Sequence, residues 1–106
     1  MPKYLLQVNY TIDGTKGLIK DGGTTRRKVA QAAAESVGGR IESFYFAFGD
    51  ADAVVIADMP DNASVAALSL VVAASGGATG RTTVLLTAEE MDQATRKTPL
   101  YKPPGA

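Results

Sequence analysis

Two aspartates, two positions apart, are the residues of this chain best placed for chemistry. Asp50 and Asp52 lie between an aromatic segment at 44–48 and an aliphatic segment at 53–56. A carboxylate that shares a half-buried surface with aliphatic side chains could act as a general base, and Asp52 is the catalytic candidate. Gly49 and Asp50 are expected to form a two-residue turn of type II′, which favours glycine first. Two carboxylates are too few to hold calcium, so no metal site is predicted.

Alternation along the strands predicts which side chains accompany Asp52. The turn sets a register in which Ala47 faces Asp52 and Tyr45 faces Val54. One face then combines aliphatic side chains with a few polar ones, which is typical of a small-molecule pocket. The residues predicted to bind a ligand there are Gln7, Asn9, Tyr45, Asp52 and Thr83. In the competing interpretation, Asp52 is solvated or bonds a neighbouring amide, and Tyr45 only packs in an interface.

The composition excludes several classes of chemistry. Cys and His are both absent, which excludes disulfides, thiol nucleophiles, zinc sites, hydrolase triads and haem-ligating His within this chain. We predict no cofactor. Lys and Arg number 11, as do Asp and Glu, so no basic field indicates nucleic acid. No segment approaches the roughly 20 apolar residues of a membrane span, and no signal-peptide pattern follows Met1. The expected compartment is the cytoplasm.

A cluster of five cations precedes and opens the first long helix. Its members are Lys16, Lys20, Arg26, Arg27 and Lys28. The glycines at 22–23 stand before this helix, whose first backbone amides could bind a carboxylate or phosphate. The alternative is a solvated face balanced by nearby acids, and no Walker or dinucleotide fingerprint is present. Arg81, at the start of the last strand, could pair with an acid or reach a ligand.

The elements that would position these residues follow from the hydrophobic periodicity. Four segments alternate as strands do: 3–10, 40–48, 51–59 and 81–87. Three segments have helical spacing: 24–37 behind a cap at 24 or 25, 62–75 behind a cap at 61 or 62, and 88–97 behind a capping box at 87–90. The connection at 11–23 is expected to consist of turns, with one helical turn at 16–20.

This order of elements predicts an α+β fold of the ferredoxin-like βαββαβ type. A four-stranded antiparallel sheet would carry its helices on one face. Residues 1–97 are predicted to form a single domain, and residues 98–106 an extended, Pro-rich C-terminal tail. The side chains expected on the helix-covered face are Tyr4, Leu6, Val8, Phe44, Phe46, Phe48, Ala51, Ala53, Val55, Val84 and Leu86.

The opposite face lacks a helix to cover it. Leu5, Val54, Ile56 and Leu85 would lie there, and burying each is worth roughly 1.5–3 kcal/mol. The economical cover is a second copy of the chain, sheet against sheet, with the ligand pocket at the subunit interface. The helix at 62–75 carries no charge, so a further interface, as in a trimer of dimers, is also expected.

Five segments resemble the GYD domain proteins: 9–11, 39–45, 49–52, 54–56 and 59–61. The resemblance extends to about Glu90 and implies a ferredoxin-like chain of the dimeric α+β barrel group, found in small bacterial proteins without an established biochemical function. The family signature has Gly, a variable residue, Tyr and Asp. Here Ala51 stands in place of that Tyr, so no role of the Tyr carries over.

Two functions remain open at this point. The first is a homo-oligomeric binding or structural module that holds a small apolar or anionic molecule between subunits. The second, which some dimeric α+β barrel proteins perform, is a cofactor-independent monooxygenase or isomerase reaction. Asp52 would be its base, with Asn9 and Tyr45 orienting the substrate. The absence of His weakens the second function, since the base must then be a carboxylate.

Overall fold

Four antiparallel strands form one sheet in the computed structural model, which describes all 106 residues. The strands are β1 (Lys3–Tyr10), β2 (Arg40–Phe46), β3 (Ala53–Asp58) and β4 (Ala78–Leu85). Their spatial order is β2-β3-β1-β4, with every neighbouring pair antiparallel. This is the strand order of the predicted ferredoxin-like α+β fold, which is confirmed.

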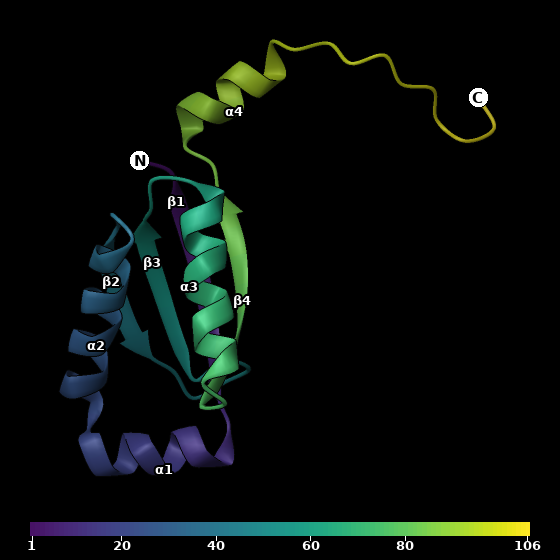
Figure 1. Ribbon diagram of the computed structural model, residues 1–106. Helices are drawn as coiled ribbons and strands as arrows, with labels where there is room; N and C mark the ends of the chain where they lie inside the picture. The colour runs from purple at the N-terminus through teal and green to yellow at the C-terminus, as the bar shows by residue number, and fades with distance from the viewer.

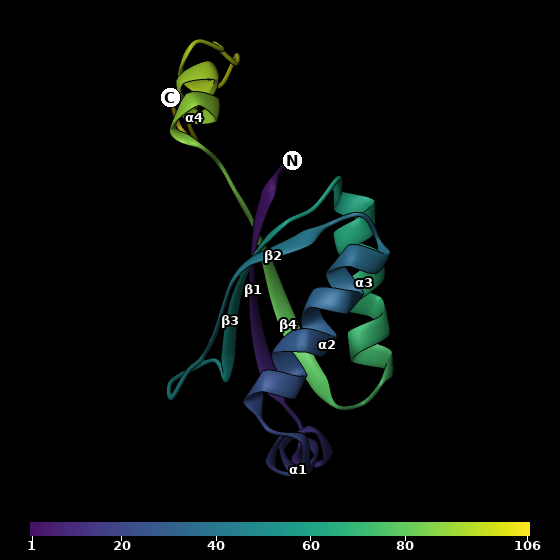
Figure 2. The same ribbon diagram turned by 90° about the vertical axis from the view of Figure 1, so that its left-hand side faces the viewer.

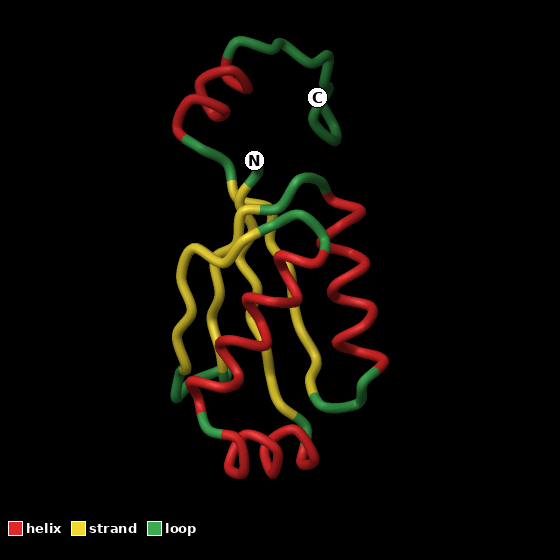
Figure 3. Tube along the Cα trace, turned by 60° about the vertical axis from the view of Figure 1, so that its left-hand side comes forward, coloured by secondary structure: helices red, strands yellow, loops and turns green.

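The two longest helices cover one face of the sheet and leave the other bare. The helices are α1 (Ile12–Asp21), α2 (Gly23–Ser36), α3 (Asn62–Ala74) and α4 (Ala88–Thr95). Helices α2 and α3 lie over the same face, while α1 crosses one end of the sheet (Figure 1). Seen from the side, the face opposite α2 and α3 carries no helix (Figure 2). Helix α4 and the C-terminal segment stand beyond the other end of the sheet, away from the remaining elements (Figure 3).

Helix α1 occupies most of the connection that was expected to be turns. Thr11 caps it, since its Oγ1 accepts a hydrogen bond from the Gly14 amide at 3.1 Å. Asp13 in the first turn and Lys20 in the last turn both suit the helix dipole. The Thr11 amide also donates to the Gly77 carbonyl at 3.1 Å, which ties the start of α1 to the loop before β4. The glycines of this segment favour turns in the sequence pattern, but the cap at Thr11 and the contact with Gly77 stabilise a helix.

Two glycines of α1 give a matched pair of substitutions. A Cβ on Gly14 would collide with the backbone carbonyl of Gly77, whereas a Cβ on Gly17 would meet no atom within 4 Å. We expect Gly14→Ala to destabilise the fold by about 1–3 kcal/mol, the usual range for overpacking. Gly17→Ala should instead stabilise it by about 0.5–1 kcal/mol through helix propensity. Urea denaturation followed by circular dichroism measures both, and equal effects of the two variants would contradict the contact between α1 and Gly77.

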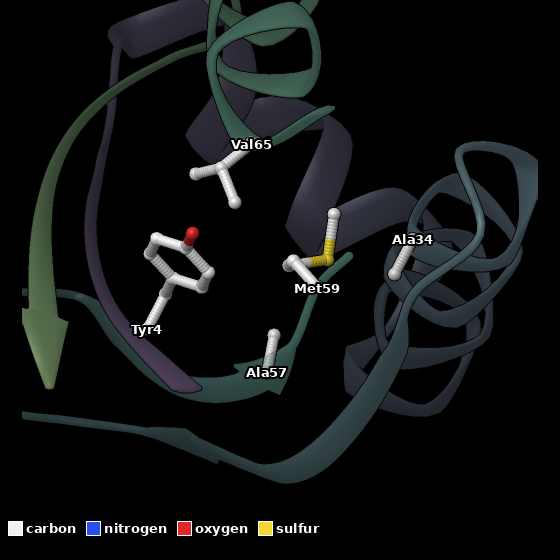
Figure 4. Packing of buried hydrophobic residues seen from close by; sticks show 5 residues of the cluster. All are labelled: Tyr4, Ala34, Ala57, Met59 and Val65. Atoms are coloured by element: carbon white, nitrogen blue, oxygen red, sulfur yellow. The ribbon is translucent and has the colours of Figure 1, made fainter. Parts of the chain in front are cut away.

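The core lies between the sheet and helices α2 and α3. Its buried members are Tyr4, Ala34, Ala57, Met59 and Val65, whose side chains converge on one interior space (Figure 4). Tyr4 pairs with Ala57 across β1 and β3, as the alternation predicted for this face requires. The Tyr4 hydroxyl donates to Asn62 Oδ1 at 2.6 Å, so the ring fills the core while its polar tip is satisfied at the start of α3.

The predicted core is too large at both ends of the sheet, at Phe48 on one end and at Val84 and Leu86 on the other. Phe48 is fully exposed, and Val84 and Leu86 are each more than half exposed. Strand β2 stops at Phe46, so Phe48 lies in the following loop, beyond the reach of the helices. Val84 lies on the edge strand β4, and Leu86 follows its last residue, so neither is enclosed from both sides.

The hairpin register is confirmed, but its turn is not of the predicted type. Tyr45 pairs with Val54, Phe46 pairs with Ala53, and the Ala47 amide donates to the Asp52 carbonyl at 2.9 Å. A type II′ turn needs a positive φ at Gly49, and Gly49 is not among the glycines with positive φ. The strands end earlier than predicted, and residues 47–52 form an irregular loop.

A β-bulge interrupts β2 near its start. Ile41 pairs with Ala57 and Ser43 pairs with Ile56, so Glu42 is the additional residue. As a result Ile41 packs against the core, while Arg40 lies beside Asp58 on the other face. Constant alternation along β2 would have exchanged the faces of these two side chains.

The caps of the later helices follow the sequence closely, and that of α2 does not. Asp61 accepts from the Ser64 amide at 2.8 Å at the start of α3, and this hydrogen bond lowers the pKa of Asp61. The predicted capping box of α4, between Thr87 and Glu90, is present in both directions. Helix α2 begins at Gly23, after Gly22 and without a side-chain cap, so the predicted cap at Thr24 or Thr25 is wrong and both residues lie inside the helix.

Candidate functional site

The bare face of the sheet, called the open face here, has an apolar centre. Leu5 pairs with Ile56, and Gln7 pairs with Val54, across β1 and β3. Leu5, Val54 and Ile56 are only half-buried in the single chain. Tyr45, the neighbour of Val54 on β2, is 71% exposed. The open face therefore leaves aliphatic and aromatic side chains in contact with solvent.

One end of the open face carries a charged cluster around Asp58. The Lys3 Nζ donates to Asp58 Oδ1 at 2.8 Å and to Glu42 Oε2 at 3.2 Å, and the Arg40 Nε donates to Asp58 Oδ2 at 3.1 Å. The Asp58 side chain is only 5% exposed. The hydrogen bond from Lys3 is the main reason that the pKa of Asp58 lies below its ordinary value. The bonds to Asp58 and Glu42 raise the pKa of Lys3.

The other end of the open face carries a polar hollow, called the Arg81 hollow here. Its volume is about 230 Å³, and its lining residues are Gln7, Asn9, Asp50, Thr79, Gly80 and Arg81. Gln7 pairs with Arg81, and Asn9 pairs with Thr79, so four side chains of β1 and β4 share this end of the face. Asn9 Nδ2 donates to the Asp50 carbonyl at 3.1 Å, which links the β2–β3 loop to the rim.

The cation in this hollow has no acidic partner. The three ion pairs of the chain involve only Lys3 or Arg40, and no side-chain hydrogen bond engages the Arg81 guanidinium. The sequence left two roles open for Arg81, pairing with an acid or reaching a ligand. The structure leaves its five donors available at the edge of the apolar centre.

A second hollow lies at the outer edge of β2. Arg27 and Gln31 of α2 line it on one side, and residues 41–45 of β2 line it on the other, with a volume of about 400 Å³. Arg27 is the one member of the predicted basic cluster that lines either of these two hollows. None of the five basic residues of that cluster takes part in an ion pair.

The five residues predicted to bind a ligand are distributed rather than gathered. Gln7 and Asn9 line the Arg81 hollow, and Tyr45 lines the second hollow. Asp52 and Thr83 line neither, and Thr83 lies opposite Leu5 on β4. The Asp52 Oδ2 accepts a hydrogen bond from the Tyr10 amide at 2.8 Å, which ties the loop to the end of β1. One carboxylate oxygen of Asp52, the proposed base, is thus already bonded to a backbone amide.

The sequence analysis missed the charged cluster. It placed Arg81 at the start of the last strand but did not predict which residues lie beside it. Asp58 was predicted only as part of a strand ending at Met59, and its two cations are far from it in sequence. An acid at the end of one strand and cations at the ends of two others indicate an ion-pair cluster only when the register of the three strands is known. Gln7 and Arg81 likewise become neighbours only through the pairing of β1 with β4.

Two general features complete the description of the surface. No group of three or more acidic side chains gathers where it could hold a metal ion. None of the helices has the length and apolar character needed to span a bilayer.

Comparison with known proteins gives one result. Curated proteins and solved structures yield no match to this chain. The family model of the GYD domain, by contrast, matches residues 4–95, which include β1 from its second residue, the other three strands and helices α1 to α4. The predicted resemblance is confirmed, and the chain belongs to the GYD domain family.

Proposed function

We propose that this protein is a homodimeric binding module that encloses a small molecule between two open faces. The observation that carries the proposal is the uncovered apolar centre at Leu5, Val54 and Ile56, with a polar hollow at its edge. A few polar groups in an otherwise apolar wall are what small-molecule sites require. Binding is favoured over catalysis because Asp52, the candidate base, is held by the Tyr10 amide and lines neither hollow.

The surface area of the single chain supports a partner. Its accessible surface is 7493 Å². Folded monomers of this size expose about 5,600 Å², so the chain leaves a large excess uncovered. Part of this excess belongs to α4 and the C-terminal segment, which extend outward and raise the radius of gyration to 16.9 Å from the roughly 13 Å of a compact chain of this length. The excess does not by itself point to the open face; the half-buried Leu5, Val54 and Ile56 do. A standard interface would cover about 800 Å² on each partner.

A second uncovered surface supports assembly beyond a dimer. Leu70 and Val71 on α3 are each about 70% exposed, and α3 carries no charged residue. Surface helices normally present a polar face to solvent. The outer side of α3 is therefore the contact through which dimers would assemble further.

A charge at the centre of the open face tests the proposal. We expect Val54→Lys to weaken the dimer about 30-fold or more, the effect of losing about 2 kcal/mol at an interface centre. The matched control is Ile19→Lys, since Ile19 is 80% exposed on α1, away from the open face. Analytical ultracentrifugation gives the dissociation constants, and circular dichroism confirms that both variants fold. A wild-type chain that sediments as a monomer, or a Val54→Lys variant that dimerises like Ile19→Lys, would contradict the proposed interface.

A further inference from the structure

We infer that the Arg81 hollow is a binding site for the carboxylate of a small acid whose apolar part lies over the centre of the open face. The inference rests on the proposed binding function of this face and adds the class of ligand. It arises from three features of the hollow: an unpaired guanidinium, polar neighbours that are neutral apart from Asp50 on the rim, and a position beside Gln7, whose partner on β3 is Val54 of the apolar centre.

The guanidinium determines the sign of the ligand. Arg81 is charged at every accessible pH and presents a planar fork that matches the two oxygens of a carboxylate. The other cations of the open face, Lys3 and Arg40, are already bonded to Asp58 at the far end. When a partner or ligand covers this face, an unpaired Arg81 would lose solvation without compensation, so an anion is required at this position.

The neighbours of Arg81 determine how the anion is held. Gln7 lies directly opposite Arg81 and offers an amide, and Thr79 on the same strand offers a hydroxyl. Asn9 already donates to the Asp50 carbonyl and so helps to fix the rim. Neutral donors beside one guanidinium suit a monoanion, because a dianionic phosphate would meet only one cation here.

The border of the hollow determines the rest of the ligand. Gln7 pairs with Val54 on its other side, and Leu5 precedes it by two positions on the same face of β1. Val54 therefore lies two strands from Arg81, at about 10 Å by the usual strand spacing, and the apolar centre begins beyond Gln7. The complementary molecule is a short amphipathic acid, with its charge at Arg81 and its hydrocarbon part along Leu5 and Val54.

Asp50 sets a limit on affinity. It lines the same hollow, and its carboxylate makes no ion pair with Arg81. An acid at the rim repels an incoming anion, so removing its charge should strengthen binding. A site built for a cationic ligand would show the opposite response, and this distinguishes the two.

The experiment compares hexanoate with hexanamide, which has the same shape and no charge. Both are titrated into the ¹⁵N-labelled full-length chain and followed by amide chemical shifts. We expect hexanoate to bind about tenfold more tightly, as hydrogen bonds to charged groups allow, and to shift the amides of Gln7, Gly80 and Arg81. Arg81→Gln should abolish the preference, Arg81→Lys should retain part of it, and Asp50→Asn should strengthen hexanoate binding a few-fold.

Arg27→Gln is the matched control, because Arg27 lines the second hollow and should not affect the preference. Equal affinities for the two probes, or an unchanged preference in Arg81→Gln, would overturn the inference. Inorganic phosphate that displaces hexanoate from the same amides at equal concentration would overturn the assignment to carboxylates.

Sedimentation of the same samples separates this inference from the proposed dimer. A dimer that shows no preference for hexanoate, and that weakens in Arg81→Gln, would mean that Arg81 pairs with an acid of the second copy; the ligand assignment then fails and the dimer stands. A monomer that retains the preference would overturn the dimer and leave the carboxylate site in place.

Discussion

Tyr4→Ala is expected to destabilise the fold by about 3–5 kcal/mol, the range found when a large aromatic side chain is removed from a core. Tyr4 is 2% exposed and is the largest side chain among the buried residues. It contacts the cluster formed by β3, α2 and α3, so its removal leaves a cavity that small neighbours such as Ala57 and Ala34 cannot fill. Such a loss is a large fraction of the stability of a small domain. Urea denaturation monitored by circular dichroism measures it.

Tyr4→Phe separates the ring from the hydroxyl. The variant keeps the packing and removes only the hydrogen bond to Asn62, whose side chain remains accessible to water. Its expected loss is about 0.5–1.5 kcal/mol, the net value of one such bond. If Tyr4→Phe were as destabilising as Tyr4→Ala, the hydroxyl rather than the ring would organise this part of the core.

Asp58→Asn is expected to destabilise the fold by about 1.5–3 kcal/mol, the value of hydrogen bonds to charged groups. The two carboxylate oxygens accept from Lys3 and Arg40 separately, and an amide would turn a donor toward one of the two cations. The loss should stay below the roughly 3–5 kcal/mol of a fully buried pair, because Arg40 and Lys3 both reach solvent. Glu42→Gln, which removes only the more exposed bond to Lys3, should have a much smaller effect.

The dependence on pH gives a second readout for Asp58. Its pKa in the folded chain lies below the ordinary value of 3.8, so in acid the unfolded chain binds a proton that the folded chain does not. Stability therefore falls as the pH falls from above 3.8 through the folded pKa. Asp58→Asn lacks this contribution, so the difference between wild type and variant should shrink in that window. A constant difference between pH 3 and pH 7 would show that the charge of Asp58 is not the stabilising feature.

The sheet was predictable because alternation is a local property. Tyr4, Leu6 and Val8 share the helix-covered face of β1, and the register of β2 with β3 follows from the hairpin at Tyr45 and Val54. The start of α3 was predicted to within one residue, since a preceding proline and a capping side chain at 61 or 62 mark it, and Asp61 is the cap. Each of these features depends on residues close together in sequence or on a repeat of two.

Other features depend on contacts that no local pattern contains. Helix α1 has two glycines and a weak apolar stripe, and its contact with Gly77 involves a loop more than sixty residues away. The Arg81 hollow exists because β4 pairs with β1 in one register, which places Gln7 beside Arg81. The sequence identified polar residues for this face, but which of them lie together depends on the pairing of β1 with β4. The split of the predicted ligand residues between two hollows has the same origin.

The bulge in β2 works on this strand as a single inserted letter works on a reading frame. Before Glu42, the even-numbered Arg40 points outward and the odd-numbered Ile41 points inward. After Glu42 the assignment is reversed, so that odd-numbered residues point outward and even-numbered residues point inward. If Glu42 instead paired as an ordinary strand residue, Arg40 would point toward the interior and Ile41 outward, with composition unchanged. Asp58 would then lose one cation, and the core would gain a charged side chain. The position of one unpaired residue in β2 thus carries information that the chemical character of the strand does not.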